Sequence, residues 1–230
     1  MGENMKNRSL KFKLILSGVL VVVIPLTVVG LFAINKASDA LIAGAENQAA
    51  QIAQNLATMT DSVLSQEVKL VKEMGINPLI REAVNTVSKE GIDNAGPALQ
   101  ALDNFLKTVS EKIGQDYDTF FVTNARGVAI SDNFNGSLRE KKVSFSDREY
   151  FIKARTTGKP AVGQAIASRN TGNPVIGIVV PIKTASGAFG GIFGAAVKLD
   201  ELSRKITSVT LGSTGYPFMV DKTGLIVAHP

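Results

Sequence analysis

The sequence predicts an α+β protein with an N-terminal membrane helix, a long second helix, and one antiparallel sheet further along the chain. Three observations predict this class. A charge-free apolar stretch near the N-terminus is long enough to cross a bilayer, helically spaced apolar residues follow it, and β-rich runs separated by turn residues begin after Gly114. Because the helices precede the strands instead of alternating with them, the α+β class is favoured over α/β.

The predicted membrane helix is Leu14–Ile34, which contains no charged residue and has about the twenty apolar residues that a bilayer core requires. Pro25 is tolerated inside such a helix as a kink. Basic residues precede the helix at Lys6, Arg8, Lys11 and Lys13. Since basic residues favour the cytoplasmic side, we expect residues 1–13 to be a cytoplasmic tail and the chain after Asn35 to lie outside the inner (plasma) membrane.

A cleaved signal peptide is the alternative interpretation of this apolar stretch. Signal peptides have a shorter apolar core, of about 7–15 residues. The sequence Ala33-Ile34-Asn35 is also a poor match to the small residues that a cleavage site requires. We therefore expect an uncleaved anchor that holds the folded part of the chain on the periplasmic or extracellular side.

Residues 35–75 are predicted to form one long amphipathic helix that ends at Gly75. The apolar residues recur at steps of three, four and seven, at Leu41, Ala45, Ile52, Leu56, Met59, Val63, Leu70 and Met74. Their seam is thin, with Gln48 at one inward position. Such a helix suits a stalk that pairs with a second copy in a homodimer, or a helix that packs on its own domain, and both interpretations stay open.

Two shorter helices and a hairpin are predicted next. Asn77-Pro78 has the N-cap and proline signature of a helix start, and Gly96-Pro97 opens a helix that runs to Gly114. Thr119–Thr123 and Val128–Ser131 are short β-rich runs on either side of the turn sequence Asn-Ala-Arg-Gly. Glycine at the end of that turn supplies a positive φ, so the two runs are expected to form a β-hairpin.

A further helix and three strands complete the predicted sheet. Ser146-Asp147-Arg148-Glu149 has the spacing of a capping box, which predicts a short helix over Tyr150–Thr156. The strands are expected at Ala161–Ser168, Pro174–Lys183 and Phe189–Lys198, with turn residues between them. These three strands and the hairpin are expected to form one central antiparallel sheet.

The hairpin sequence occurs twice. Phe121–Ile130 aligns without a gap on Phe218–Val227, with an apolar pair, Asn or Asp, two variable residues, Gly and an apolar run in each copy. A connecting helix is expected over residues 199–211, so residues 212–230 are expected to begin a second module of the same kind. One hairpin is marginal by itself, and we therefore expect the chain to be a fragment or an early-terminated form of a longer protein.

Composition excludes several function classes. The formal charge of +5 comes mainly from the basic N-terminal residues, and no basic stripe follows a path for a phosphate backbone, so no nucleic-acid partner is expected. The chain has no cysteine and one histidine, His229. These residues provide neither a nucleophile–base pair nor a metal cluster, and we expect no enzyme activity, no metal and no cofactor.

Several segments carry a resemblance to a known family, namely FSDREYFIKARTTGKP, TGNPVIGIVVPI, GGIFGAAVKLDEL and GSTGYPFMVDKTGLIVAHP. With the anchor and the stalk helix, they resemble the double-Cache sensor domains of bacterial chemoreceptors and related sensor kinases. The resemblance implies two PAS-like modules on a stalk, with small ligands bound by the membrane-distal module, here residues 76–198. In complete members a second membrane helix leads to a HAMP linker and a cytoplasmic domain, usually a methyl-accepting one.

The resemblance also implies where a ligand binds. Family pockets are lined by the segment that enters and forms the short helix and by the facing strands, which gives the candidates Phe145, Asp147, Arg148, Tyr150, Phe151 and Ser168. A guanidinium fork suits a carboxylate, and an arginine in a first helical turn opposes the helix dipole unless an anion compensates. The alternative is a solvated Arg148 paired with Asp147 or Glu149. Adjacent aromatic residues on a helix point in different directions, so one of Tyr150 and Phe151 is expected in the core.

The amino-acid-binding branch of the family combines this arginine with an aromatic pair, an earlier tyrosine and a later aspartate. Arg148 matches and Tyr150-Phe151 replaces the pair, but Val143 and Ala196 stand at the other two positions. Without the aspartate no group receives an α-ammonium, so the resemblance favours a small organic acid over an amino acid as the ligand.

Three functions compete at this point. The first is the extracytoplasmic sensing domain of a transmembrane chemoreceptor that reports a small-molecule ligand for chemotaxis. The second is the input domain of a sensor histidine kinase or diguanylate cyclase. The third is a membrane-tethered structural module without a ligand, which a filled, apolar cavity at Arg148 would favour.

Overall fold

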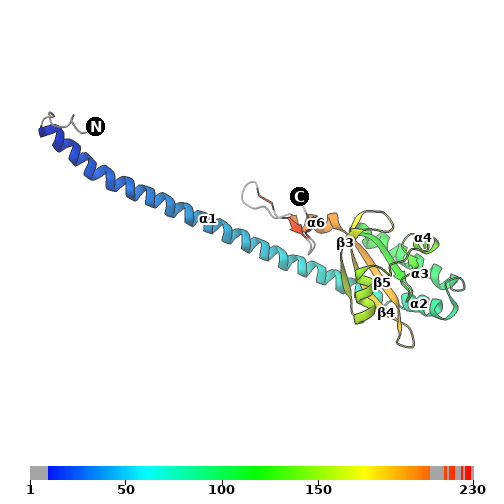
Figure 1. The fold of residues 1–230 in the computed structure, drawn as a ribbon. Helices are drawn as coiled ribbons and strands as arrows, with labels where there is room; N and C mark the ends of the chain where they lie inside the picture. The colour runs from blue at the N-terminus through cyan, green and yellow to red at the C-terminus, as the bar shows by residue number, and fades with distance from the viewer. Residues whose placement is uncertain (1–9, 208–214, 217, 221–223, 225, 229–230) are drawn as a thin grey trace. The chain divides into compact units, whose positions relative to one another are not determined.

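The computed structural model describes residues 10–207, 215–216, 218–220, 224 and 226–228 (Figure 1). The chain divides into two compact units, residues 1–55 and 56–230. Helix α1, Leu10–Gly75, contributes to both units. The predicted membrane and stalk helices are thus one continuous helix, because no proline or glycine separates Ile34 from Ala37 and Pro25 lies inside the helix.

In the first unit, the described residues are all helical and almost all exposed. They include a stretch long and apolar enough to cross a membrane, and none of that stretch is buried inside the chain. The core helix of a soluble domain buries its apolar side chains, whereas large residues such as Val21 and Phe32 remain mostly exposed. This helix is therefore a candidate membrane anchor.

The second unit is built around a five-stranded antiparallel sheet in the order β2-β1-β5-β4-β3. The strands are β1 Tyr117–Thr123, β2 Ala129–Asp132, β3 Ala161–Ala167, β4 Pro174–Lys183 and β5 Phe189–Lys198. The predicted hairpin and the three later strands are confirmed, with β4 and β5 starting and ending at the predicted residues. The mixture of helices and one antiparallel sheet confirms the predicted α+β class.

Helices cover both faces of this sheet. The larger core lies between the sheet and the part of α1 after Leu56, together with α2 Pro78–Glu90 and α3 Gly96–Ile113 (Figure 1). A short 3₁₀ turn, η1 Gly114–Asp116, leads from α3 into β1. The smaller core lies on the opposite face under α4 Ser137–Glu140 and α5 Glu149–Thr157. Side chains of a strand alternate between faces, so the sheet separates the two cores.

The start of α2 follows the predicted cap. Asn77 Oδ1 accepts a hydrogen bond from the backbone N–H of Leu79 at 2.9 Å, and Pro78 occupies the first helical position. We expect Asn77→Ala to lower the free energy of unfolding by about 1 kcal/mol, because it leaves that N–H without its acceptor. Asn77→Asp is the control, since it keeps an acceptor. Equal urea midpoints for the alanine and aspartate variants would contradict this role.

The predicted capping box before α5 is wrong. Helix α5 starts at Glu149 and its N-cap is Arg148, while Ser146 Oγ bonds Ser144 Oγ at 3.0 Å. The predicted helix Tyr150–Thr156 is itself confirmed, as α5, and a turn precedes it in which the backbone N–H of Arg148 donates to Phe145 O at 3.0 Å. Arg148 therefore lies at the N-cap with an extended backbone, and not inside the first helical turn.

The repeated hairpin is confirmed for the described residues near the C-terminus. Strands β6 Met219–Val220 and β7 Ile226–Ala228 pair as Met219↔Ala228 and Val220↔Ile226, with a register shift between the pairs. The aligned positions in the first copy pair as Val122↔Ser131 and Thr123↔Ala129, with the same shift. The turn glycine has a φ of 83° in one copy and 86° in the other.

The connecting helix α6 spans Leu199–Thr207, so the predicted helix is confirmed up to Thr207. Its last four predicted residues, 208–211, lie outside the described residues, as does part of the predicted second module. The assignment of residues 212–230 to a second module stays a prediction.

Candidate ligand-binding site

Four of the six predicted site residues line one small pocket in the second unit. Phe145, Arg148, Tyr150 and Ser168 surround it, together with residues of β1, β3, β4 and β5. Its cavity volume is about 20 Å³. Polar lining comes also from Thr119, Arg169 and Asn170, and no carboxylate lines the pocket within the described part of the chain.

One nitrogen of Arg148 is a buried donor that the described residues leave unsatisfied. Its Nη2 donates to the carbonyl of Ala167 at the end of β3, at 3.1 Å. Its Nε is buried and has no hydrogen-bond partner among the described residues. An unsatisfied buried donor costs about 1–3 kcal/mol, and such groups are rare in native structures. An acceptor atom from a bound molecule would satisfy it.

Tyr150 forms an aromatic wall of the same pocket. Its ring packs against two strands at Gly163 and Gly177, where an added Cβ would lie 2.7 Å from ring carbons. Burial raises the pKa of Tyr150 to about 12, so the side chain is a neutral phenol at physiological pH. The position of the ring depends on both glycines.

Gly177→Ala tests this packing. The new methyl group would overlap the rigid ring, so we expect a loss of about 1–3 kcal/mol in the free energy of unfolding and a displaced Tyr150. Gly96→Ala is the control, because its methyl group would lie in open space. Gly187→Ala is less suitable, since Gly187 has a φ of 83°, which is strained for alanine. A Gly177→Ala variant as stable as Gly96→Ala would contradict the contact.

Phe151 lies on the other side of α5 and does not line the pocket. It is fully buried in the smaller core and meets Phe189 edge-on, with ring centroids 5.8 Å apart. Of the adjacent aromatic pair, one member thus faces the pocket and the other the core, as their helical spacing predicts.

Asp147 pairs with Arg169, which no motif in the sequence marks as its partner. Its carboxylate accepts from Arg169 Nη2 at 2.6 Å. Slight desolvation acts in the opposite direction, but this hydrogen bond lowers the pKa of Asp147 below its usual range. The Arg169 guanidinium also lies over the ring of Phe145, 5.7 Å from the centroid, and Phe145 stacks on Phe121 at 4.4 Å. Asp147 therefore does not line the pocket, but it holds Arg169, which does.

Ser168 begins the turn Ser168–Asn173, which joins β3 to β4. Its Oγ donates to Asp118 Oδ2 at 2.5 Å, so its hydroxyl is tied to β1 at the edge of the pocket. Sequence reasoning missed Asp118 and Thr119 because nothing local marks them. The run of polar residues after β3 is the sequence signal that indicates a turn there.

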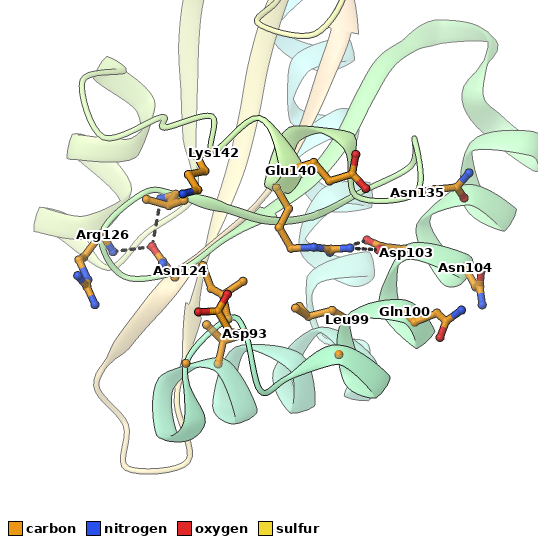
Figure 2. A pocket seen from close by; sticks show the side chains of 16 residues that line it. Asp93, Leu99, Gln100, Asp103, Asn104, Asn124, Arg126, Asn135, Glu140 and Lys142 are labelled. Atoms are coloured by element: carbon orange, nitrogen blue, oxygen red, sulfur yellow. Dashed lines mark hydrogen bonds and ion pairs between the residues drawn. The ribbon is translucent and has the colours of Figure 1, made fainter.

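A larger cavity, of about 960 Å³, lies between the α2–α3 connection, the β1–β2 hairpin and α4 (Figure 2). Arg139 and Asp103 form an ion pair on its wall, with Nη2 and Oδ2 2.8 Å apart. Arg139 Nη1 also donates to the carbonyl of Ile130, and Ser131 Oγ donates to Asp103 at 2.6 Å. These buried polar groups are satisfied by the chain itself, so the pair holds the fold together and does not require a ligand.

Metal binding finds no support in the part of the chain that the structure describes. It contains no group of three or more histidine, cysteine, aspartate or glutamate side chains that could hold an ion. At the Arg148 pocket, the group that the chain offers to a bound molecule is a guanidinium hydrogen-bond donor.

The described part of the chain combines a candidate membrane helix with an α+β domain that has a small pocket at Arg148. A family model described as "Cache domain", of the double-Cache type, matches residues 33–230, and the chain belongs to this family. Cache domains are ligand-binding sensor domains found in chemoreceptors and histidine kinases. A comparison with curated protein sequences gave no match.

Solved structures with the same fold come from both kinds of receptor. The ligand-binding domain of the Pseudomonas aeruginosa PAO1 amino-acid chemoreceptor PctC, in complex with GABA, is 18% identical, with 80% of this chain and 75% of that chain covered and a TM-score of 0.55. The sensor domain of the V. cholerae histidine kinase DctB is 13% identical, with 70% of this chain and 58% of that chain covered and a TM-score of 0.57. The Campylobacter jejuni chemoreceptor Tlp3 domain with 4-methylisoleucine is 16% identical, with 80% and 68% covered and a TM-score of 0.51. At these identities the likeness concerns the fold.

Proposed function

We propose that this chain is the extracytoplasmic sensing part of a transmembrane chemoreceptor and that it binds a small organic acid at Arg148. The observation that carries the proposal is the buried, unpartnered Nε of Arg148 at a pocket with arginines and no carboxylate in its described lining. The polar groups Thr119, Ser168 and Asn170 argue against a structural module with a filled, apolar cavity.

A carboxylate without an amine fits these residues best. The guanidinium of Arg148 offers a charge-assisted donor, whereas the guanidinium of Arg169, also in the lining, is already paired with Asp147. Ala196 lines the pocket at the position where the amino-acid-binding branch has its aspartate. An ammonium group would meet the positive charge of Arg148 and no carboxylate in the described lining, which is unfavourable.

The proposal is tested by the thermal unfolding of the chain in lipid nanodiscs. Acetate, propionate, lactate, pyruvate and succinate should be compared with the matching amides and with L-amino acids at equal concentration. We expect at least one carboxylate to raise the melting temperature and its amide to have no effect, since only a ligand of the folded state stabilises it. A folded sample that responds to none of them, or to the amides equally, would argue against an organic-acid sensor.

A sensor histidine kinase is the second candidate for the kind of receptor to which this sensing domain belongs. It is motivated by the likeness to the DctB sensor domain, which is a kinase sensor, alongside the chemoreceptor domains of PctC and Tlp3. The ligand-binding proposal is common to both outputs. Sequencing the gene beyond Pro230 distinguishes them, because a methyl-accepting domain or a kinase domain would follow.

We also propose that the receptor is a homodimer through residues 35–55 of α1, whose described side chains are almost all exposed. The chain has no cysteine, so single cysteines can be introduced without background. Gln48→Cys, on the apolar seam, is expected to form an intermolecular disulfide in membranes at least about tenfold faster than Ala50→Cys, half a turn away. Equal rates would contradict a stalk dimer with this seam.

A further inference from the structure

One wall of the Arg148 pocket is the turn Ser168–Asn173, which the Arg169–Asp147 ion pair also ties to the segment before α5. Its first residues line the cavity, whereas much of the remaining lining belongs to strands held by backbone ladders. The cavity of about 20 Å³ holds roughly one water-sized sphere, so a small organic acid requires the lining to separate. Displacing the turn breaks side-chain contacts, while displacing a strand breaks a ladder, and the turn is therefore the part that yields first.

The turn is bonded to β1 through the buried carboxylate of Asp118, and also through Asn170 Nδ2, which donates to Thr119 Oγ1 at 3.4 Å. Asp118 accepts hydrogen bonds from Ser168 Oγ at 2.5 Å, from Thr171 Oγ1 at 2.5 Å and from Asn173 Nδ2 at 3.4 Å. Asp118 is itself buried. Because three residues of the turn share this acceptor, the turn and the start of β1 move together unless these bonds are broken.

A β-bulge places Asp118 where it can do this. Tyr117 pairs with Val197 and Thr119 with the adjacent Ala196 of β5, so Asp118 is the extra residue in β1. Bulges redirect side chains and commonly lie beside functional sites. As a result Asp118 bonds the turn, while its neighbour Tyr117 belongs to the core on the other face of the sheet.

On that other face, Tyr117 is bonded to helix α1. Its hydroxyl donates to Glu67 Oε2 at 2.5 Å. Burial, and then the hydrogen bond to Glu67, raise the pKa of Tyr117, so the hydroxyl keeps its proton and the bond persists at physiological pH. The ring packs on Phe120, 4.7 Å between centroids, which keeps Tyr117 fixed relative to the sheet. Two consecutive residues thus connect the pocket turn to the stalk helix through the sheet.

We propose that Asp118 and Tyr117 form a mechanical relay that reports the position of the Ser168–Asn173 turn to Glu67 on helix α1. The inference rests on the proposed function for the origin of the movement, since a ligand at Arg148 displaces the turn. The displaced turn pulls on Asp118, the start of β1 shifts, and Tyr117 carries the shift to the segment 63–71 of α1. Asp118 and Tyr117 are positioning residues and contact no ligand.

The relay is tested by hydrogen exchange of the whole chain in nanodiscs, without any ligand. Ser168→Ala combined with Thr171→Val removes two of the bonds to Asp118 and leaves the buried carboxylate and the sheet in place. We expect amide exchange to accelerate at least about threefold in the turn and also in segment 63–71. Adding Tyr117→Phe, which keeps the ring, should restrict the response to the turn.

Thr184→Val is the matched control. Thr184 Oγ1 bonds Ser186 and Ala188 within the turn between β4 and β5, so its loss loosens a comparable turn that has no bond to Asp118. We expect faster exchange in residues 184–188 and unchanged exchange in segment 63–71. This control separates the relay from a general loss of stability, which would affect all segments.

Two results would overturn the relay: unchanged exchange in segment 63–71 when the turn is loosened, or an equal response with and without the Tyr117 hydroxyl. Because no ligand is used, these results are distinct from a failure of the proposed function. A carboxylate screen without a response would count against the sensing proposal, whereas the exchange data alone decide the relay.

Discussion

Arg148→Ala is expected to weaken the binding of a responsive carboxylate by about a hundredfold or more, with little change in the melting temperature of the ligand-free chain. The guanidinium would supply a charge-assisted bond in a shielded site, and losing such a partner costs about 2–5 kcal/mol of binding free energy. In the free chain the substitution removes one bond to Ala167 and also the unsatisfied Nε, so these effects on stability largely offset each other.

Isothermal titration calorimetry compares the carboxylate affinity of Arg148→Ala with that of two further variants. Arg148→Lys keeps the charge without the fork and should bind with intermediate affinity. Arg155→Ala removes another arginine of the same segment, one that lies over the Phe151 ring at 5.6 Å and not in the pocket lining, and should bind as the wild type does. Wild-type affinity for Arg148→Ala, or a melting temperature lowered by many degrees, would assign Arg148 to the fold.

Asp103→Ala is expected to lower the free energy of unfolding by about 3–5 kcal/mol, the largest effect on stability among the variants considered. Asp103 is 5% exposed, and its loss leaves the half-buried Arg139 guanidinium without its counter-ion and Ser131 without its acceptor. Urea denaturation of the chain in nanodiscs measures the change as a shifted midpoint at constant slope.

Asp147→Ala is the matched control, since it breaks an arginine–carboxylate pair of similar length at the surface. The Asp147 side chain is 66% exposed, so we expect a loss below about 1 kcal/mol. The double variant Asp103→Leu/Arg139→Met should regain part of the lost stability, because no uncompensated charge remains. A loss below about 1 kcal/mol for Asp103→Ala would show that the pair is hydrated and dispensable.

The features that sequence predicts well here are those encoded within a few residues. The N-cap at Asn77, the glycine turn of the hairpin and the bounds of β4 and β5 follow from local turn chemistry and hydrophobic pattern. The repeated hairpin was visible for the same reason, since both copies keep the glycine at the positive-φ position.

What sequence missed depends on contacts between distant residues. The box before α5 failed because the Phe145–Arg148 turn competes with the cap, and the spacing alone does not reveal that turn. Asp147 pairs with Arg169 and not with Arg148, which no linear pattern indicates. The bulge at Asp118 depends on the register of β1 against β5, and this is set by tertiary packing.

The measurement that tests the central claim most directly is the NMR signal of arginine Nε–H groups. Arginine-selective ¹⁵N labelling of the chain in nanodiscs, with Arg148→Lys to assign the resonance, follows the Arg148 Nε–H, a buried donor without a hydrogen-bond partner among the described residues. With a stabilising carboxylate added, we predict that the Arg148 Nε–H resonance shifts with ligand concentration and that the Arg139 resonance stays in place. A titration that shifts Arg139 and leaves Arg148 unchanged would place the ligand in the larger cavity and contradict the account.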